Sequence, residues 1–246
     1  MNILLKDLVM AGVRWELSET SVGFMEMVSC AHATPSRTRT AAVVPATAPA
    51  TPMDIETANA MALRPTTMDA LNRMILEFNH PLRSGATNVV VPTAAPNPNG
   101  LVIITDIPSG DDDASGKILS GAAGELLDKM LTAIGMSRES VSILPLVFWR
   151  TPGGRTPTRI ELDLARPFVN RAIELLEPRI ILTLGTLAAT EIAGIDLMKN
   201  HGDEIVLPND IRVFPIYHPN YLILKPGAKA DAWNVLQNVQ KMLKSV

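Results

Sequence analysis

Apolar positions follow two different spacings in residues 67–246. Four short apolar runs, bounded by turn-forming residues, have the composition of strands that are buried on both faces. Between these runs apolar residues recur every three or four positions, which predicts helices with one buried side. The expected strands are Leu101–Ile104, Ser142–Phe148, Arg179–Leu184 and Ile211–Ile216, and the expected helices are 67–78, Gly121–Ile134, Thr158–Leu176, Thr186–Ala193 and Ala228–Leu243.

This alternation of strands and helices predicts an α/β fold. We expect a three-layer α/β/α arrangement around a central, mostly parallel four-stranded sheet. The loops that follow parallel strands open at one edge of the sheet, and ligands bind at that edge. A functional site is therefore expected where the loop from Asp106 to Gly116 meets the loop that carries His218 and Pro219.

The N-terminal quarter of the chain has a different pattern. Apolar residues at helical spacing in 3–15 predict an amphipathic helix within a region 1–31, and such a helix needs a surface to dock on, which a protein partner could supply. Residues 32–66 are mainly Ala, Thr and Pro, bury little, and predict a disordered linker. The folded domain is expected over 67–246.

Composition agrees with a folded domain and excludes several classes of protein. Of the 246 residues, 47% are hydrophobic and 19% are charged, which suffices for a substantial core. The chain has neither a long apolar run nor a signal-peptide pattern, so we expect a cytoplasmic location, away from membranes. We also expect a monomer. Its single cysteine, Cys30, excludes an intramolecular disulfide and a cysteine-ligated cluster.

The net charge of −3 gives no general attraction to a polyanion. Arginines are nevertheless concentrated in one stretch that contains few acids. They predict a local basic face, and scattered arginines on a solvated helix surface are the alternative. These residues are Arg150, Arg155, Arg159, Arg166, Arg171 and Arg179.

The loop after the first expected strand is rich in acids. Asp106 and 111–113 lie beside Gly110 and Gly116, so carboxylates could orient a water or hold a cation while glycines let a ligand approach. A solvated surface loop is the plain alternative. A calcium loop is disfavoured because the glutamate expected at its twelfth position is missing.

Two other loops carry candidate chemistry. His218, fixed by the following proline at a strand exit, could hydrogen-bond a developing anion, with Tyr221 or Leu222 as a wedge against a base. A structural histidine is the alternative. Arg150 and Arg155, in a loop rich in turn formers, suit contacts to phosphate, although a plain connector would have the same composition.

Together these loops resemble the uracil-DNA glycosylase superfamily, most closely the family 4 enzymes that carry a 4Fe–4S cluster. The resemblance runs from about Met74 to the C-terminus. The matching segments are Thr105-Asp106-Ile107-Pro108-Ser109, Gly116–Asp128, Ala165–Phe168, Leu184–Ala189 and Tyr217–Leu222.

The resemblance implies roles for individual residues. Asp106 stands in place of the family's glutamate as the catalytic carboxylate, and His218 would donate to the departing base. The target nucleotide would be flipped out of the DNA. The implied substrate-binding residues are Ile107, Pro108, Ser109, Leu119, Pro145 and Gly185, and the implied DNA-binding residues are Arg150, Arg155, Pro219, Asn220, Tyr221 and Leu222.

This sequence departs from the family pattern at the positions that recognise the base and at those that bind the cluster. Leu119 replaces the aromatic residue that stacks on uracil, and Pro145 replaces the asparagine that reads it. The four cluster cysteines correspond to positions without a thiolate, so no 4Fe–4S cluster, metal or other cofactor is expected. Those positions are Glu77, His80, Trp149 and Ala165.

The resulting hypothesis is a divergent DNA N-glycosylase of base excision repair. It would hydrolyse the N-glycosidic bond of a flipped uracil or other damaged base, in single- or double-stranded DNA. The main alternative is a catalytically degenerate nucleic-acid-binding protein that keeps the glycosylase fold. A hydrolase that acts on a small nucleotide-like ligand is the third.

Overall fold

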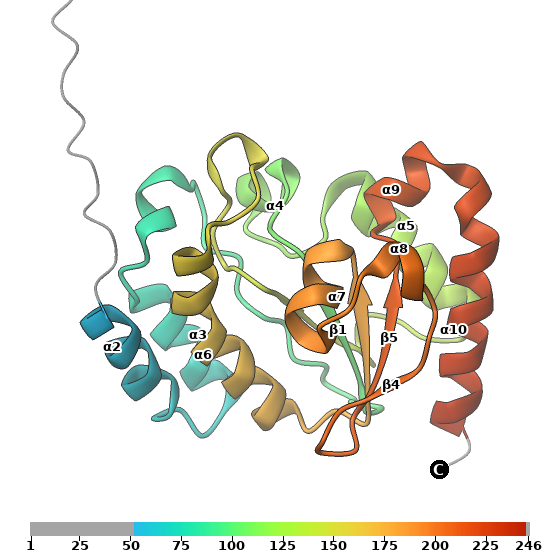
Figure 1. Ribbon diagram of the computed structural model, residues 1–246, viewed down its shortest axis with the longest axis horizontal. Helices are drawn as coiled ribbons and strands as arrows, with labels where there is room; N and C mark the ends of the chain where they lie inside the picture. The colour runs from blue at the N-terminus through green and yellow to red at the C-terminus, as the bar shows by residue number, and fades with distance from the viewer. Residues whose placement is uncertain (1–51, 245–246) are drawn as a thin grey trace, which may run out of the picture. The chain divides into compact units, whose positions relative to one another are not determined.

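The computed structural model describes residues 52–244, and it contains a five-stranded sheet in the order β2-β1-β3-β5-β4 (Figure 1). The expected helix in 3–15 and most of the expected linker lie outside the described residues. Four strands are parallel, and β4 runs antiparallel to β5. The strands are β1 (Leu101–Thr105), β2 (Ser142–Pro145), β3 (Ile180–Leu184), β4 (Ile205–Val206) and β5 (Arg212–Ile216).

Helices cover both faces of the sheet, which confirms the expected α/β class and three-layer arrangement (Figure 1). Three short 3-10 segments, η1 (Pro81–Gly85), η2 (Pro152–Gly154) and η3 (Pro226–Ala228), lie in the connections. The α-helices are α2 (Pro52–Ala62), α3 (Met68–Glu77), α4 (Gly110–Ser115), α5 (Gly121–Ala133), α6 (Arg159–Leu176), α7 (Thr186–Ala193), α8 (Leu197–Asn200), α9 (Pro219–Leu224) and α10 (Lys229–Lys244).

The sequence of strand β1 does not alternate between apolar and polar residues, because the strand is buried on both faces. Val102 and Ile104 pack into the part of the core that contains α2, α3 and α6, whereas Leu101 and Ile103 pack into the part that contains α5 and α10. Side chains of a strand point alternately to its two faces, so a strand that is buried on both faces must be apolar throughout. All five residues of β1 are buried.

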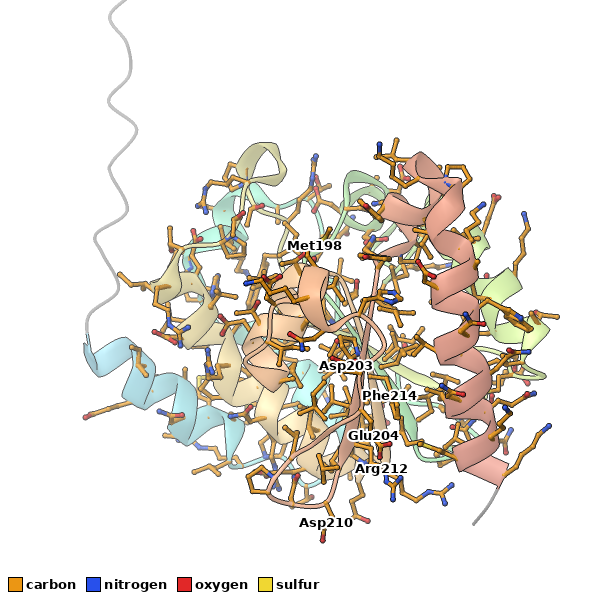
Figure 2. The ribbon with its side chains drawn as sticks, turned by 45° about the vertical axis from the view of Figure 1, so that its right-hand side comes forward. Met198, Asp203, Glu204, Asp210, Arg212 and Phe214 are labelled. Atoms are coloured by element: carbon orange, nitrogen blue, oxygen red, sulfur yellow. The ribbon has the colours of Figure 1, made fainter. Side chains whose placement is uncertain are left out.

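The sheet has one strand more than expected. The two-residue strand β4 pairs with β5 through Ile205 and Val206, and the turn between them contains Asp210 at a φ of 62° (Figure 2). A segment this short has no apolar periodicity to detect. It nevertheless closes the β5 edge with an antiparallel partner.

The expected linker over 32–66 is wrong at its C-terminal end, because Pro52–Ala62 forms α2. This helix packs along α6, and its Ala58 and Ala62 are almost completely buried. The high Ala content suggested low complexity, but alanine is the best helix former and its small side chain lets two helices approach closely. The folded domain therefore begins before residue 67.

The strand order places the edge where a ligand would bind. β1 lies between β2 and β3. The connection after β1 leads to β2 on one side of it, and the connection after β2 crosses back over β1 to β3 on the other side. The crevice outside the carboxyl ends of β1 and β3 is thus a topological switch point, the usual ligand position in such sheets. None of the helices in 52–244 is long and apolar enough to cross a membrane.

Candidate active site

Asp106, directly after β1, is held at this switch point by the N-terminus of α7. Its Oδ1 accepts a hydrogen bond of 2.7 Å from the backbone N–H of Ala188. Burial raises the pKa of Asp106 to about 6, although the N–H groups of Ala188 and Leu187 act in the opposite direction. The carboxylate is therefore both fixed in place and poised to exchange a proton near neutral pH.

Gly185 makes room for this carboxylate. Its φ is 106°, a conformation that L side chains rarely adopt, and a Cβ there would lie 2.2 Å from Asp106 Oδ2. The predicted site residue Gly185 thus lies directly against the predicted catalytic carboxylate. Its role is to let the backbone at the start of α7 approach Asp106 closely.

His218 is the N-cap of α9 and lies beside the end of β1. Its Nδ1 accepts a hydrogen bond of 3.2 Å from the backbone N–H of Asn220, so the proton of the neutral ring is on Nε2. This Nε2 lies 3.1 Å from Thr105 Oγ1, on the residue that precedes Asp106. Burial lowers the pKa of His218 to about 4, with the charge of Asp112 acting in the opposite direction.

The two predicted catalytic residues are thus brought to the same edge of the sheet. One supplies a carboxylate, and the other supplies an N–H donor on a ring that stays neutral at pH 7. A carboxylate can stabilise a positive centre or orient water, and a fixed N–H can stabilise a negative charge as it develops. This pairing suits the breaking of a bond between a cationic and an anionic fragment.

Two other acids of the 105–116 segment, Asp112 and Asp113, stabilise the segment itself. Ser109 caps α4 and forms a capping box with Asp112, whose carboxylate also accepts hydrogen bonds from the N–H and Oγ of Ser120. Asp113 accepts hydrogen bonds from the N–H groups of Thr87 and Asn88. Within residues 52–244 no three His, Cys, Asp or Glu side chains are grouped to hold a metal ion.

The remaining predicted substrate residues differ in their place and exposure. Pro145 ends β2 and pairs in register with Thr105, which places it next to the start of the Asp106 loop. Ile107 is half-buried and Pro108 is buried. Leu119 is only 2% exposed and has a φ of 48°.

Comparison with known proteins gives the ancestry of this arrangement. The model of the Uracil DNA glycosylase superfamily matches residues 91–237, which include the whole sheet and both catalytic candidates. The chain belongs to the uracil-DNA glycosylase superfamily. The expected resemblance is confirmed at this level.

Several relatives in the uracil-DNA glycosylase superfamily carry the name Type-4 uracil-DNA glycosylase. The protein from Thermotoga maritima is 32% identical over 146 residues, which cover 58% of this chain and 76% of that protein. The protein from Archaeoglobus fulgidus is 31% identical over 140 residues, 53% of this chain and 70% of that one. A DNA polymerase of Bacillus phage SP01 is 25% identical over 127 residues, which are 51% of this chain but only 14% of the polymerase.

The loop that carries Arg150 and Arg155 places these predicted DNA contacts differently. The guanidinium of Arg150 lies over the start of α4, where a Cβ on Gly110 would be 3.5 Å from its Cζ. Arg155 instead forms hydrogen bonds of 2.8 and 2.6 Å with the carboxylate of Glu161, which also caps α6. Arg155 thereby holds the pKa of Glu161 at about 2. Arg150 remains a candidate for phosphate, whereas Arg155 is already paired.

The expected basic face is largely neutralised. Arg159 and Arg166 both pair with Glu191 on α7, and Arg171 donates to the carbonyl of Pro65 and to Glu174. The pairs with Glu191 join α6 to α7, so they could not be seen in the local composition. The arginine-rich stretch is better described as a network that ties α6 to its neighbours.

The predicted wedge residues differ in exposure. Tyr221 is 37% exposed, whereas Leu222 is 1% exposed, so the expectation that Leu222 meets DNA is wrong in this structure. Sequence reasoning treated 217–222 as a loop, but Pro219–Leu224 is a helix whose inner side takes Pro219 and Leu222. Its outer side carries Ile223 and Leu224, 41% and 77% exposed, which helical spacing would have indicated.

The positions that correspond to the cluster cysteines of family 4 glycosylases do not fit an iron–sulfur cluster. Trp149 is fully buried, and the ring of His80 stacks on it at 4.4 Å with an interplanar angle of 7°. The nitrogens of His80 face the carbonyl of Glu161 and the N–H of Leu82. With Ala165 also buried, this place is filled by packed side chains, none of them a thiolate.

Proposed function

We propose that this chain is a DNA N-glycosylase that removes a flipped uracil or other damaged base in base excision repair. The observation that carries the proposal is the pair formed by Asp106, held against Gly185 and α7, and the neutral His218 with its Nε2–H at the same edge. Membership of the superfamily and relatives named Type-4 uracil-DNA glycosylase support it.

In the proposed reaction the bond between C1′ of the deoxyribose and the base nitrogen breaks. Its electron pair leaves with the base, and the Nε2–H of His218 exchanges its hydrogen bond to Thr105 Oγ1 for one to the anion that forms. The Asp106 carboxylate stabilises the oxocarbenium-like sugar and orients a water, whose oxygen bonds to C1′. The water's proton passes to Asp106, whose pKa of about 6 suits a base that works near neutral pH.

We further propose that base selectivity is broad. The family resemblance assigns base contacts to Leu119 and Pro145, and neither residue offers a stacking ring or a side-chain amide. An apolar pocket distinguishes bases by only 10- to 200-fold or so, whereas hydrogen-bonding pockets reach about 10⁴-fold or more. Damaged bases of similar size are therefore expected to compete with uracil.

On the DNA side, α9 and Arg150 are the proposed contacts. Tyr221, Ile223 and Leu224 form an exposed apolar surface directly after His218, which suits a wedge that fills the space left by a flipped nucleotide. Arg150, beside the Asp106 loop, would contact phosphate. No cofactor is proposed, because the positions that the resemblance matches to cluster cysteines carry no thiolate, and two of them, His80 and Trp149, stack on each other.

The direct test incubates the full chain with uracil-containing single- and double-stranded DNA and measures alkali-labile breaks. Excision is expected, with a rate that falls below about pH 6 as Asp106 becomes protonated, while neutral His218 leaves the profile flat up to alkaline pH. Asp106→Asn and His218→Ala should each lose about 100-fold or more. An active Asp106→Asn protein would contradict the assigned role.

A nucleic-acid-binding protein without catalysis is the second candidate. The apolar residues Leu119 and Pro145 in the base pocket favour it, because a degenerate site would lose its base-reading groups first. The same experiment separates the two. DNA binding that survives without cleavage of uracil or of a panel of oxidised and deaminated bases would establish the second candidate.

A further inference from the structure

The turn between α4 and α5 holds a leucine in an unfavourable backbone conformation. Leu119 has a φ of 48°, in the left-handed region that leucine rarely occupies. Glycines stand close by at 116 and 121, yet position 119 keeps a side chain, which is 2% exposed. Non-glycine residues persist in this region only where surrounding contacts enforce it. The neighbours of the turn should therefore include groups that hold it.

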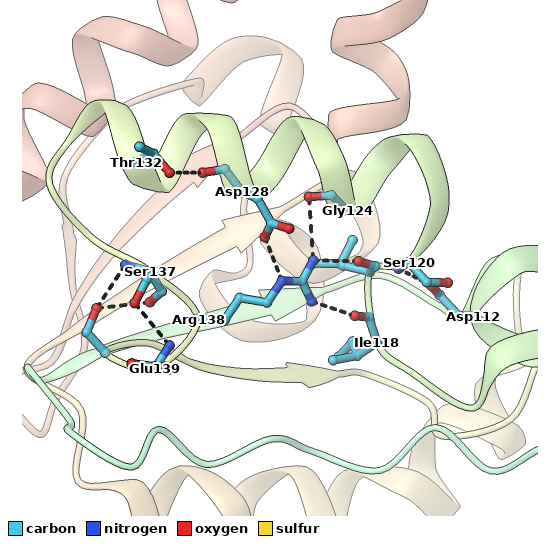
Figure 3. A network of polar contacts seen from close by, with 11 residues as sticks. Asp112, Ile118, Ser120, Gly124, Asp128, Thr132, Ser137, Arg138 and Glu139 are labelled. Carbon is cyan, nitrogen blue, oxygen red and sulfur yellow. Dashed lines mark hydrogen bonds and ion pairs between the residues drawn. The ribbon is translucent and has the colours of Figure 1, made fainter.

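Arg138 holds the turn from one side (Figure 3). Its Nη1 donates to the carbonyl of Ile118 at 2.9 Å, and its Nη2 donates to the carbonyl of Leu119 at 2.6 Å. Its Nε donates to Asp128 Oδ1 at 2.6 Å, which fixes the plane of the guanidinium. Both consecutive carbonyls of the turn thus bond to a single rigid fork of donors.

Asp112 holds the turn from the other side (Figure 3). Its Oδ1 accepts from the N–H of Ser120 at 2.6 Å and from its Oγ at 2.8 Å. Its Oδ2 accepts from the N–H of Ser109 at 2.9 Å. Asp112 is 3% exposed and lies near enough to His218 to influence its ring electrostatically. The turn is thereby connected to the Asp106 loop and to the site.

The close packing at Gly124 shows how tightly the turn is fitted. A Cβ on Gly124 would lie 1.9 Å from the carbonyl oxygen of Leu119 and 2.9 Å from Arg138 Nη2. The first turn of α5 can therefore reach the Leu119 carbonyl only because position 124 has no side chain. Arg138, by contrast, contacts this region from a side chain that is 35% exposed, so its removal leaves no cavity in the core.

We infer that Arg138 is a positioning residue for the base pocket: with Asp112 opposite it, Arg138 fixes the left-handed turn that sets Leu119 where the family places its base-stacking residue. The effect on base excision rests on the proposed function, whereas the clamp, meaning the hold of Arg138 and Asp112 on the turn, rests on the geometry of the turn alone. Loss of the guanidinium is expected to let Leu119 relax towards ordinary backbone angles. The pocket wall would then move while Asp106 and His218 stay in place.

The test uses the full chain with Arg138→Gln, Arg138→Lys and a matched control, Arg212→Gln. Arg212 forms a similarly exposed ion pair with Glu204, 2.9 Å, at the end of β5 away from His218 (Figure 2). Amide hydrogen exchange is measured by mass spectrometry on peptides that cover 116–124 and on the rest of the domain. Excision of uracil is measured in parallel, with kcat and KM separated and melting temperatures recorded.

For Arg138→Gln we expect exchange in 116–124 to rise roughly tenfold, with the remaining peptides and the melting temperature nearly unchanged. We expect kcat/KM to fall about tenfold or more, because small misplacement of a pocket wall has large effects on rate. The acid limb near pH 6 should stay where it is, since Asp106 is untouched. Arg138→Lys should recover part of both effects, and Arg212→Gln should match the wild type.

Three results would overturn the inference. Unchanged exchange in 116–124 would show that Arg138 does not hold the turn, and faster exchange across the whole domain would show a general structural role. Local loosening with unaltered excision would show that the turn does not position the pocket. If the wild type excises no base at all, the proposed function fails, and the exchange measurement alone still decides whether the clamp exists.

Discussion

At the scale of single residues, the candidate site contains two ionisable side chains, Asp106 and His218, whose charged forms are destabilised by burial. Asp106 is held in a place where burial raises its pKa to about 6, so its charged form is destabilised in the folded protein. His218 is buried so that its pKa falls to about 4 and its ring stays neutral. Burial thus keeps His218 in the neutral state that the proposed reaction needs, whereas the ionised Asp106 that the reaction needs above pH 6 is present at the expense of stability.

This arrangement predicts that Asp106→Asn is more stable than the wild type at neutral pH. An unfolded Asp titrates near 3.8 and the folded one near 6, so the native state binds more protons in that window and the wild type loses stability as pH rises through it. A difference of about two pKa units corresponds to at most about 3 kcal/mol. The advantage of the variant should be present at pH 7.5 and vanish near pH 4.

Urea unfolding at pH 4, 6 and 7.5 measures this difference. Glu125→Gln, which removes an exposed carboxylate from α5, is the control and should change stability by less than about 0.5 kcal/mol at each pH. A variant Asp106→Asn that is less stable than the wild type at pH 7.5 would contradict the linkage argument. It would mean that the hydrogen bond from Ala188 outweighs the burial of charge.

At the scale of elements, the part of the core between α3, α6 and β2 depends on an aromatic cluster. Phe78 and Phe148 contact Trp149 at ring-centroid distances of 6.4 and 5.6 Å, and His80 stacks on it at 4.4 Å. Burial lowers the pKa of His80, which keeps this ring uncharged in its apolar surroundings. Contacts between aromatic rings thus hold this part of the core together.

We therefore predict that Trp149→Ala lowers the free energy of unfolding by about 3–5 kcal/mol, the usual effect of removing a large buried aromatic. Trp233→Ala is the matched control, because Trp233 is 38% exposed on α10 and its loss should have an effect below about 1 kcal/mol. Thermal and urea unfolding measure both. Equal effects in the two variants would show that the aromatic cluster does not stabilise the domain in this way.

At the scale of the whole molecule, the distribution of charge is set by pairs that join separate helices. Glu191 on α7 contacts Arg159 and Arg166 on α6, and Glu161 binds Arg155 across the loop that precedes α6. The positive charges of these arginines are therefore neutralised by glutamates of the same domain, so they give the surface little net positive charge. Arg150 has no such pair among the contacts of residues 52–244.

This difference predicts opposite outcomes for two neighbouring arginines. Arg150→Ala should weaken DNA binding and reduce the slope of log K against log salt by about 1, as expected for one lost phosphate contact. Arg155→Ala should leave that slope unchanged and instead lower thermal stability, because Glu161 loses its partner. Salt titrations of both variants decide the matter. Equal slopes for wild type and Arg150→Ala would remove Arg150 from the proposed DNA contacts.

The sequence predicted those features that depend on local pattern. Apolar spacing predicts strands such as 101–104 and helices such as 121–134, because it reports which side of an element is buried. The position of Asp106 and His218 at one edge of the sheet was predictable because both follow parallel strands, whereas their catalytic role stays a prediction. Contacts between residues far apart in the sequence could not be predicted from local pattern. The burial of Leu222 and the pairing of Arg155 each depend on a neighbour that only the folded chain supplies.

The contact between Gly185 and Asp106 also constrains how this domain can change by mutation. While Asp106 is present, any side chain at 185 would overlap its carboxylate, so replacements of the glycine should be rejected even in a library selected for folding alone. Shortening Asp106 first would remove the overlap and leave only the strain of a φ of 106°. Substitution can therefore remove the aspartate before the glycine but hardly in the reverse order, so the carboxylate at 106 keeps position 185 a glycine for as long as it is present.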